Sequence, residues 1–262
     1  MRSTLCLAPV ALVLLGCASA ACAQEPRDYY LYQRATLPSA LHVDFETATG
    51  TRDAGALGRH GVEGLVRTGF TLGDRWTLES SVGVAEDHDT DQHGVGWSAE
   101  ARYGWRADDE GWGLGFGAGY RRSFDGVSIP YLRLVGERSM ARWNVAFNSV
   151  AEMPQSERPQ HDDVDLIESI GTSYALSSTM RAGVELAAED VEGFFSHDEA
   201  EGGAKFILGP TLNWLIGDGQ TIRAHVGWIY AATANAPTNP ESPDYRGHRN
   251  GVLARIAFGY GR

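Results

Sequence analysis

Three of the eight histidines lie in short acidic runs, where imidazole and carboxylate groups could together bind a divalent transition metal. The runs are Glu86-Asp87-His88-Asp89, His161-Asp162-Asp163 and His197-Asp198-Glu199. No pair of these histidines has the spacing of a zinc site on a helix or a strand. The sequence therefore predicts no metal and no cofactor, and His88, His161 and His197 are only weak candidates.

A larger set of charged residues recurs at every second position of segments that are otherwise apolar. Successive side chains of a β-strand point to opposite faces, so these segments predict strands with one charged face and one apolar face. Asp44, Glu46 and Glu189 follow the rule, and so do the residues that we take as candidates for lining an interior: Glu63, Arg67, Glu79, Glu100, Arg102, Arg121, Arg133, Glu137, Arg181, Glu185, Lys205, Arg223, His225 and Arg255.

Twelve segments show this two-residue period. Tight turns alternate with long acidic loops between them, and only the short turn at Asp125-Gly126 breaks the alternation, because a long loop is due there. The pattern predicts an all-β fold, a closed antiparallel up-and-down transmembrane β-barrel of about twelve strands. The segments are approximately 40–50, 60–72, 76–86, 94–106, 112–123, 127–137, 141–152, 165–176, 179–190, 204–216, 220–232 and 250–261.

Aromatic residues on the apolar faces are sorted by strand end. One group lies beside the tight turns or the C-terminus, namely Phe70, Trp76, Trp105, Trp112, Trp143, Tyr174, Trp214 and Tyr260. A second group lies at the opposite ends, namely Trp97, Tyr120, Phe206, Trp228 and Tyr230. Two such bands are typical of the girdles that mark the two interfaces of a membrane.

The N-terminus has the features of a secretory signal peptide over residues 1–23. Arg2 precedes an apolar run and the small-residue site Ala21-Cys22-Ala23. All three cysteines of the chain lie in this segment, so we expect none in the mature protein. Leu14-Leu15-Gly16-Cys17 also resembles a lipobox, so lipidation of Cys17 stays open as an alternative.

The segment from 40 to 262 resembles the Gram-negative outer-membrane β-barrel proteins as a class. The resemblance rests on the turn rhythm, the two aromatic bands and a last strand that alternates as far as Phe258 and Tyr260. Gly261 and Arg262 stand where such barrels usually have a final aromatic residue. The resemblance implies an outer-membrane location, a periplasmic segment over 24–39, and contacts with outer-membrane lipid, lipopolysaccharide and the barrel-assembly machinery.

The net charge of −12 argues against nucleic acid as a partner. For the barrel interior two hypotheses stay open, and both can hold at once. A ladder of salt bridges could fill the interior and give a closed barrel with a structural or surface-binding role. Alternatively, the charged face could line a porin-like path for small polar or charged solutes. A hydrolase is the least favoured, because His42 and His225 face inward without a His-x-Ser motif.

Two further features bear on how open that path is. Gly113, Gly115, Gly117 and Gly119 all fall on the inward face, either to relieve strain in a curved sheet or because something packs against them: an inward loop, the Tyr29-Tyr30-Leu31-Tyr32 segment or a substrate. Phe194 and Phe195 lie in an acidic loop. Since burying a phenylalanine is worth roughly 1.5–3 kcal/mol, we expect this loop to fold onto the rim or into the mouth, as a constriction.

Overall fold

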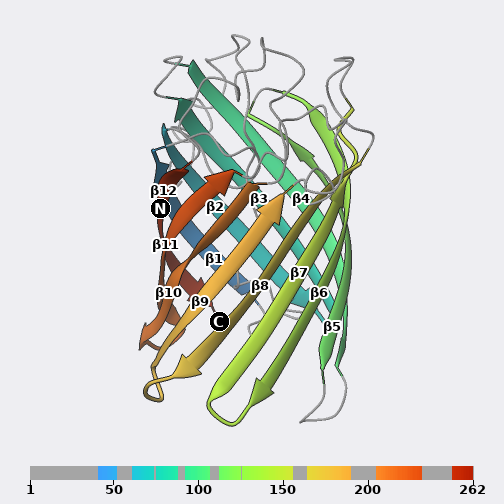
Figure 1. The fold of residues 1–262 in the computed structure, drawn as a ribbon. Helices are drawn as coiled ribbons and strands as arrows, with labels where there is room; N and C mark the ends of the chain where they lie inside the picture. Colours follow the sequence, from blue (N-terminus) through green and yellow to red (C-terminus); the bar gives the residue numbers. More distant parts are fainter. Residues whose placement is uncertain are drawn as a thin grey trace, which may run out of the picture.

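The computed structural model describes residues 41–51, 61–73, 75–87, 92–106, 112–124, 126–155, 164–189, 205–231 and 250–261. Twelve antiparallel strands pair with their sequence neighbours, and β1 pairs with β12, so that the sheet closes into a barrel (Figure 1). The strands are β1 (Leu41–Gly50), β2 (Gly61–Leu72), β3 (Trp76–Asp87), β4 (Gln92–Arg106), β5 (Gly113–Arg122), β6 (Ser128–Met140), β7 (Trp143–Glu152), β8 (Asp165–Ala175), β9 (Met180–Glu189), β10 (Lys205–Gly217), β11 (Gln220–Ala231) and β12 (Asn250–Gly261).

The predicted fold class and strand number are therefore confirmed. The clearest difference in bounds is at β6, which we expected to end at 137. It continues to Met140 because Arg138, Ser139 and Met140 pair with β7, and the turn is reduced to Ala141 and Arg142. Within the described ranges, no helix is long and apolar enough to cross a membrane.

The two ends of the barrel differ. At one end, called the turn end here, tight turns join β2 to β3, β6 to β7, β8 to β9 and β10 to β11. Gly73 and Gly219 supply the positive φ angles, +61° and +76°, that two of these turns need. β1 begins and β12 finishes at this same end, because His42 pairs with Gly261. The opposite end is called the loop end.

The outer face of the barrel is apolar. Phe45, Phe116 and Trp228 are each more than half exposed, at 57%, 56% and 55%. A soluble protein buries such side chains, so their exposure around a closed sheet indicates a surface that faces lipid. Aromatic residues pair across strands near the turn end, where Trp143 and Tyr174 have ring centroids 5.0 Å apart.

Arginines of the turns reach these rings. Arg75 Nη1 donates to Tyr103 Oη at 2.8 Å, and Arg142 Nη1 donates to Tyr174 Oη at 3.2 Å. An amphipathic ring beside a cation is typical of the region where lipid tails give way to headgroups. The structure thus places the predicted band of aromatic residues at the turn end on the outer face.

Most buried side chains face the lumen, and nearer the loop end they include, besides the charged Arg121, Glu152, Glu189 and Lys205, a set of apolar residues. These apolar residues form a cluster that we call the apolar collar, with contributions from eight strands: Ala48, Tyr131, Val150, Ile167, Ala187, Ile207, Ile229 and Leu253. Each member lies in the half of its strand that is closer to the loop end. The two-residue period in the sequence predicts the charged luminal residues but not this collar.

Candidate functional site: the charged luminal wall

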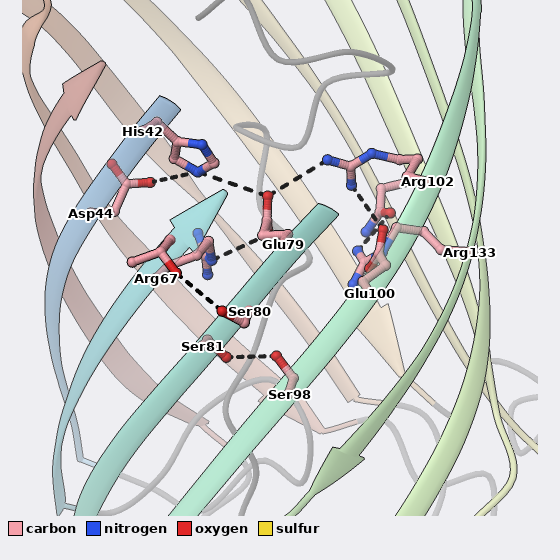
Figure 2. Close-up of polar contacts among 12 residues, drawn as sticks. His42, Asp44, Arg67, Glu79, Ser80, Ser81, Ser98, Glu100, Arg102 and Arg133 are labelled. Atoms are coloured by element: carbon pink, nitrogen blue, oxygen red, sulfur yellow. Dashed lines mark hydrogen bonds and ion pairs between the residues drawn. The ribbon is translucent and has the colours of Figure 1, made fainter. Parts of the chain in front are cut away.

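Glu100 of β4 is the centre of the charged wall (Figure 2). Its Oε1 accepts a hydrogen bond from Arg102 Nη1 at 3.0 Å. Its Oε2 accepts from Arg133 Nε at 2.7 Å and from the Tyr131 hydroxyl at 3.1 Å. One carboxylate therefore balances two guanidinium groups, and hydrogen bonds of this kind are about twice as strong as those between neutral groups.

Glu79 of β3 continues the network toward β1 and β2. Its Oε1 lies 3.6 Å from Arg67 Nε, and its Oε2 lies 3.6 Å from Arg102 Nη2 and 3.8 Å from His42 Nε2. Arg102 is thus shared between Glu79 and Glu100, and Figure 2 shows the three side chains meeting over the inner face of β3 and β4.

The network extends further at both ends. Asp44 Oδ2 lies 3.9 Å from His42 Nε2 and 2.5 Å from Arg223 Nη2 of β11. At the other end, Arg133 Nη1 donates to Asn148 Oδ1 of β7 at 3.0 Å. We call this set the ion-pair belt, and its charged or titratable members are Arg223, Asp44, His42, Glu79, Arg67, Arg102, Glu100 and Arg133.

The glycines of β5 let the belt cross that strand. Glu100, Gly119 and Tyr131 are in register on three neighbouring strands. A Cβ at Gly119 would overlap the Tyr131 ring, and one at Gly117 would lie 2.8 Å from Glu100 Oε1. Side chains therefore pack against the inward glycines at Gly117 and Gly119, but they are not the inward loop, the Tyr29–Tyr32 segment or the substrate named as possible occupants. The occupants are side chains of β4 and β6.

Two smaller groups of ion pairs lie outside the belt. Arg121 of β5 pairs closely with Glu152 of β7. Arg255 of β12 lies 3.0 Å, through Nε, from Glu46 Oε1 and 3.4 Å, through Nη2, from Glu63 Oε1. Moving an unpaired charge into a protein interior costs several kcal/mol, so pairing is the condition under which these side chains can be buried.

The remaining candidates are distributed over the wall. Arg181 donates through Nε to Ser173 Oγ at 3.2 Å, near the turn end. Lys205 is in register with Glu189, and both are buried. Glu185 and His225 are buried on β9 and β11, and Glu137 is partly exposed on β6. The structure thus brings Glu79, Glu100, Arg67, Arg102, Arg133 and Arg223 together and leaves Glu137, Arg181, Glu185, Lys205 and His225 outside the belt.

Three polar partners were missed by the sequence analysis: Glu152, Tyr131 and Asn148. The two-residue period places Asn148 and Glu152 on the inward face of β7, so the pattern could have identified both. Tyr131 carried no such signal, because a tyrosine suits an aromatic band as well as an interior. His88, His161, His197, Phe194 and Phe195 lie outside the described residues, as do the expected signal peptide and the segment 24–39.

No group of three or more His, Cys, Asp or Glu side chains in the described strands has the geometry to hold a metal ion. What the wall offers is a continuous polar surface with fixed charges of both signs. Such a surface can replace part of the hydration shell of a polar solute.

Removal of the Tyr131 hydroxyl in a Tyr131→Phe variant should lower the free energy of unfolding by about 1–2 kcal/mol, because a buried carboxylate loses one donor but keeps two arginines. Tyr103→Phe is the matched control. It loses a hydroxyl that bonds Arg75 at an exposed position, and the change there should be within about 0.5 kcal/mol. Urea titration of both variants in lipid vesicles measures the difference. Equal losses of unfolding free energy in the two variants would contradict a role of Tyr131 in the belt.

A closed antiparallel barrel with an apolar outer face and a charged lumen is the architecture of transmembrane β-barrels. No family model matches the sequence, and no curated protein is similar to it in sequence. Solved outer-membrane barrels share the fold. The COG4313 outer membrane channel from Pseudomonas putida F1 has a TM-score of 0.60 at 14% identity, over 90% of this chain and 98% of the other.

A porin named KdgM is similar at a TM-score of 0.57 and 12% identity, over 84% of this chain and 99% of the porin. The same porin in complex with disordered oligogalacturonate has a TM-score of 0.59 at 10% identity, over 84% of this chain and 99% of the porin. The chain therefore has the fold of the outer-membrane β-barrel proteins.

Proposed function

We propose that the protein is an outer-membrane, porin-like channel that allows small polar or charged solutes to pass without an energy source. The observation that carries the proposal is the ion-pair belt, a polar surface that runs around the luminal wall from Arg223 on β11 to Asn148 on β7. The fold shared with a porin and an outer membrane channel supports it. On this proposal the chain is exported through a cleaved signal peptide and contacts lipopolysaccharide and the barrel-assembly machinery.

The proposed solutes are small, because the belt side chains fill much of the lumen. Arg102 is 1% exposed and Glu100 is 6% exposed. Oligogalacturonate, the ligand of the similar porin, is not proposed for this chain. The luminal arginines that could bind it, Arg67, Arg102 and Arg133, already contact Glu79 and Glu100.

The same low exposure favours a second candidate, a closed barrel with a structural or surface-binding role. In that case the ion pairs would hold the wall together and no path would open. The two candidates differ in one measurable property, which is the flow of ions through a single barrel.

Purified protein in planar lipid bilayers at high salt is expected to give discrete conductance steps, small compared with those of a wide porin, since twelve strands enclose less room than sixteen. The folded state is checked first, by the shift in gel mobility between unheated and boiled samples. Folded protein without steps, under all voltages and salts tested, would exclude the channel and leave the closed barrel.

A further inference from the structure

The luminal wall changes its chemistry along the axis of the barrel. Toward the turn end it carries the ion-pair belt, the apolar collar follows, and the buried charged residues Arg121, Glu152, Glu189 and Lys205 lie beyond the collar at the loop end. Ser81 and Ser98 lie one inward position beyond Glu79 and Glu100, with their hydroxyl oxygens 2.6 Å apart. A solute that crosses the barrel would therefore meet an apolar surface between two charged ones.

Phe124 completes the collar over the strands that contribute nothing to it. The collar residues come from β1 and from β6 to β12. Over β3 and β4, the inward positions Gly83 and Gly94 have no side chain. A Cβ at Gly83 would lie 3.3 Å from Phe124 Cζ and 3.1 Å from Leu65 Cδ1, and one at Gly94 would lie 2.6 Å from Phe124 Cβ. The Phe124 ring therefore lies on the luminal side of these two strands.

The turn that carries Phe124 is held by its own hydrogen bonds. The Ser123 amide donates to Val127 O at 2.9 Å, and the Gly126 amide donates to Ser123 O at 3.0 Å. The Val127 amide donates to Ser123 Oγ at 2.9 Å. Gly126 has a φ of +86°, which a side chain would strain. Phe124 is 8% exposed, so the short β5–β6 turn fixes an aromatic ring inside the barrel.

The collar is as inaccessible as the belt but cannot bind water in the same way. Ile167, Ile207 and Ile229 are at most 1% exposed although they point into the lumen. A charged side chain of the belt can exchange its partner for water or for a passing solute, whereas an aliphatic side chain offers no hydrogen bond. Apolar constrictions therefore lose water, and a solute pays the cost of its own dehydration there.

We propose that the apolar collar, together with Phe124, is the selectivity barrier of the channel and ranks solutes by how strongly they are hydrated. This inference rests on the proposed channel function. It predicts that the polarity of the collar controls conductance and that the same change elsewhere on the wall does not.

The matched variants are Val150→Thr in the collar and Val135→Thr on β6. Val135 is also inward and 0% exposed, but it lies outside the collar, nearer the turn end. Threonine nearly keeps the volume of valine and replaces one methyl group with a hydroxyl. The collar variant should raise the single-channel conductance about twofold or more, because hydroxyls let water enter the constriction. Val135→Thr should leave it unchanged, and Phe124→Ala should raise it by widening the constriction.

Swelling of vesicles that contain the protein tests the ranking of solutes with free valine and free threonine, which match in size and differ in hydration. Valine should enter faster through the natural barrel, and the ratio of the two rates should approach one in the collar variant. Each variant is first shown to be folded by its gel mobility.

Four outcomes are distinct. Higher conductance of the collar variants, with Val135→Thr unchanged, supports the inference. Steps from a collar variant when the natural protein is silent would mean that the natural barrel is closed, which overturns both the channel and the inference. If all proteins give conductance steps of equal size, and valine and threonine enter at equal rates, the inference is overturned and the channel remains. Silence of all folded proteins overturns both.

Discussion

A Glu100→Gln variant is expected to lose about 3–5 kcal/mol of unfolding free energy, the range for breaking a buried ion pair by removing one partner. Glutamine keeps the shape of the side chain but removes the charge that balances Arg102 and Arg133, whose nitrogens lie 3.0 and 2.7 Å away. Two guanidinium groups would then face each other across Gly117 without their shared counter-charge. Denaturant titration of the barrel in lipid vesicles, followed by gel mobility, measures the loss.

Glu86→Gln on β3 is the control for this change. Glu86 also faces an ion-pairing partner, His93, at 3.9 Å, but both side chains are more than half exposed. An exposed pair is worth about 0–1 kcal/mol, so this variant should unfold close to the natural protein. Similar losses in the two variants would mean that the belt contributes no more to stability than an exposed pair does.

The Arg121–Glu152 pair should show the opposite response to single and double substitution. Arg121→Met or Glu152→Leu alone leaves one buried charge and should cost about 3–5 kcal/mol. The double variant removes both charges from a site where each side chain is at most 5% exposed, and it should recover most of that loss. Apolar residues of similar volume often replace a buried pair without cost.

The measurement is a double-mutant cycle of unfolding free energies. A double variant as unstable as the sum of the two single variants would show that the two side chains act independently, against the contact between β5 and β7. Arg121 lies two residues before Ser123, so the conductance of the double variant also reports whether the β5–β6 turn keeps its position.

Most of the fold could be predicted from the sequence, because each strand has two chemically different faces. The two-residue period therefore assigns residues to the luminal face and to the outer face at the same time. The exception is β8, because neither face of the segment 165–176 is clearly apolar in the sequence. The structure shows why. Ile167 points into the lumen with 0% exposure, whereas Glu168 is on the outer face, with Oε1 accepting from Ser149 Oγ at 2.6 Å. With an apolar residue facing the lumen and an acidic residue on the outer face, the alternation of apolar and polar residues no longer distinguishes the two faces.

The charged wall was predictable as a set of residues but not as a network. The sequence places Glu79, Glu100 and Arg102 on the inward face of β3 and β4, but it does not predict that Glu100 forms an ion pair with Arg133 across β5. That contact depends on the register of β4, β5 and β6, which brings Gly119 between Glu100 and Tyr131. Register is decided by the whole sheet, so a reading of single strands cannot supply it.

The collar was missed for a related reason. Its members look like ordinary strand residues, and most have polar residues or glycine beside them on the inward face, as Ile229 has Gly227 and His225. Only the tilt and pairing of neighbouring strands bring such residues to one level. Phe124 was missed because a phenylalanine in a short turn has no periodic signal.

The closure between β1 and β12 has a consequence for the order in which the chain can fold. Thr51 and Val252 exchange hydrogen bonds across a separation of 201 residues, with the Thr51 amide donating to Val252 O at 2.9 Å. Contacts so distant in the chain form late, since a long loop must close before they yield any free energy. Until Asn250–Gly261 arrives, β1 and β11 each keep a row of unpaired backbone groups that lipid cannot satisfy. A partly formed barrel is therefore not stable in a membrane, and the insertion of the whole chain depends on the pairing of β12.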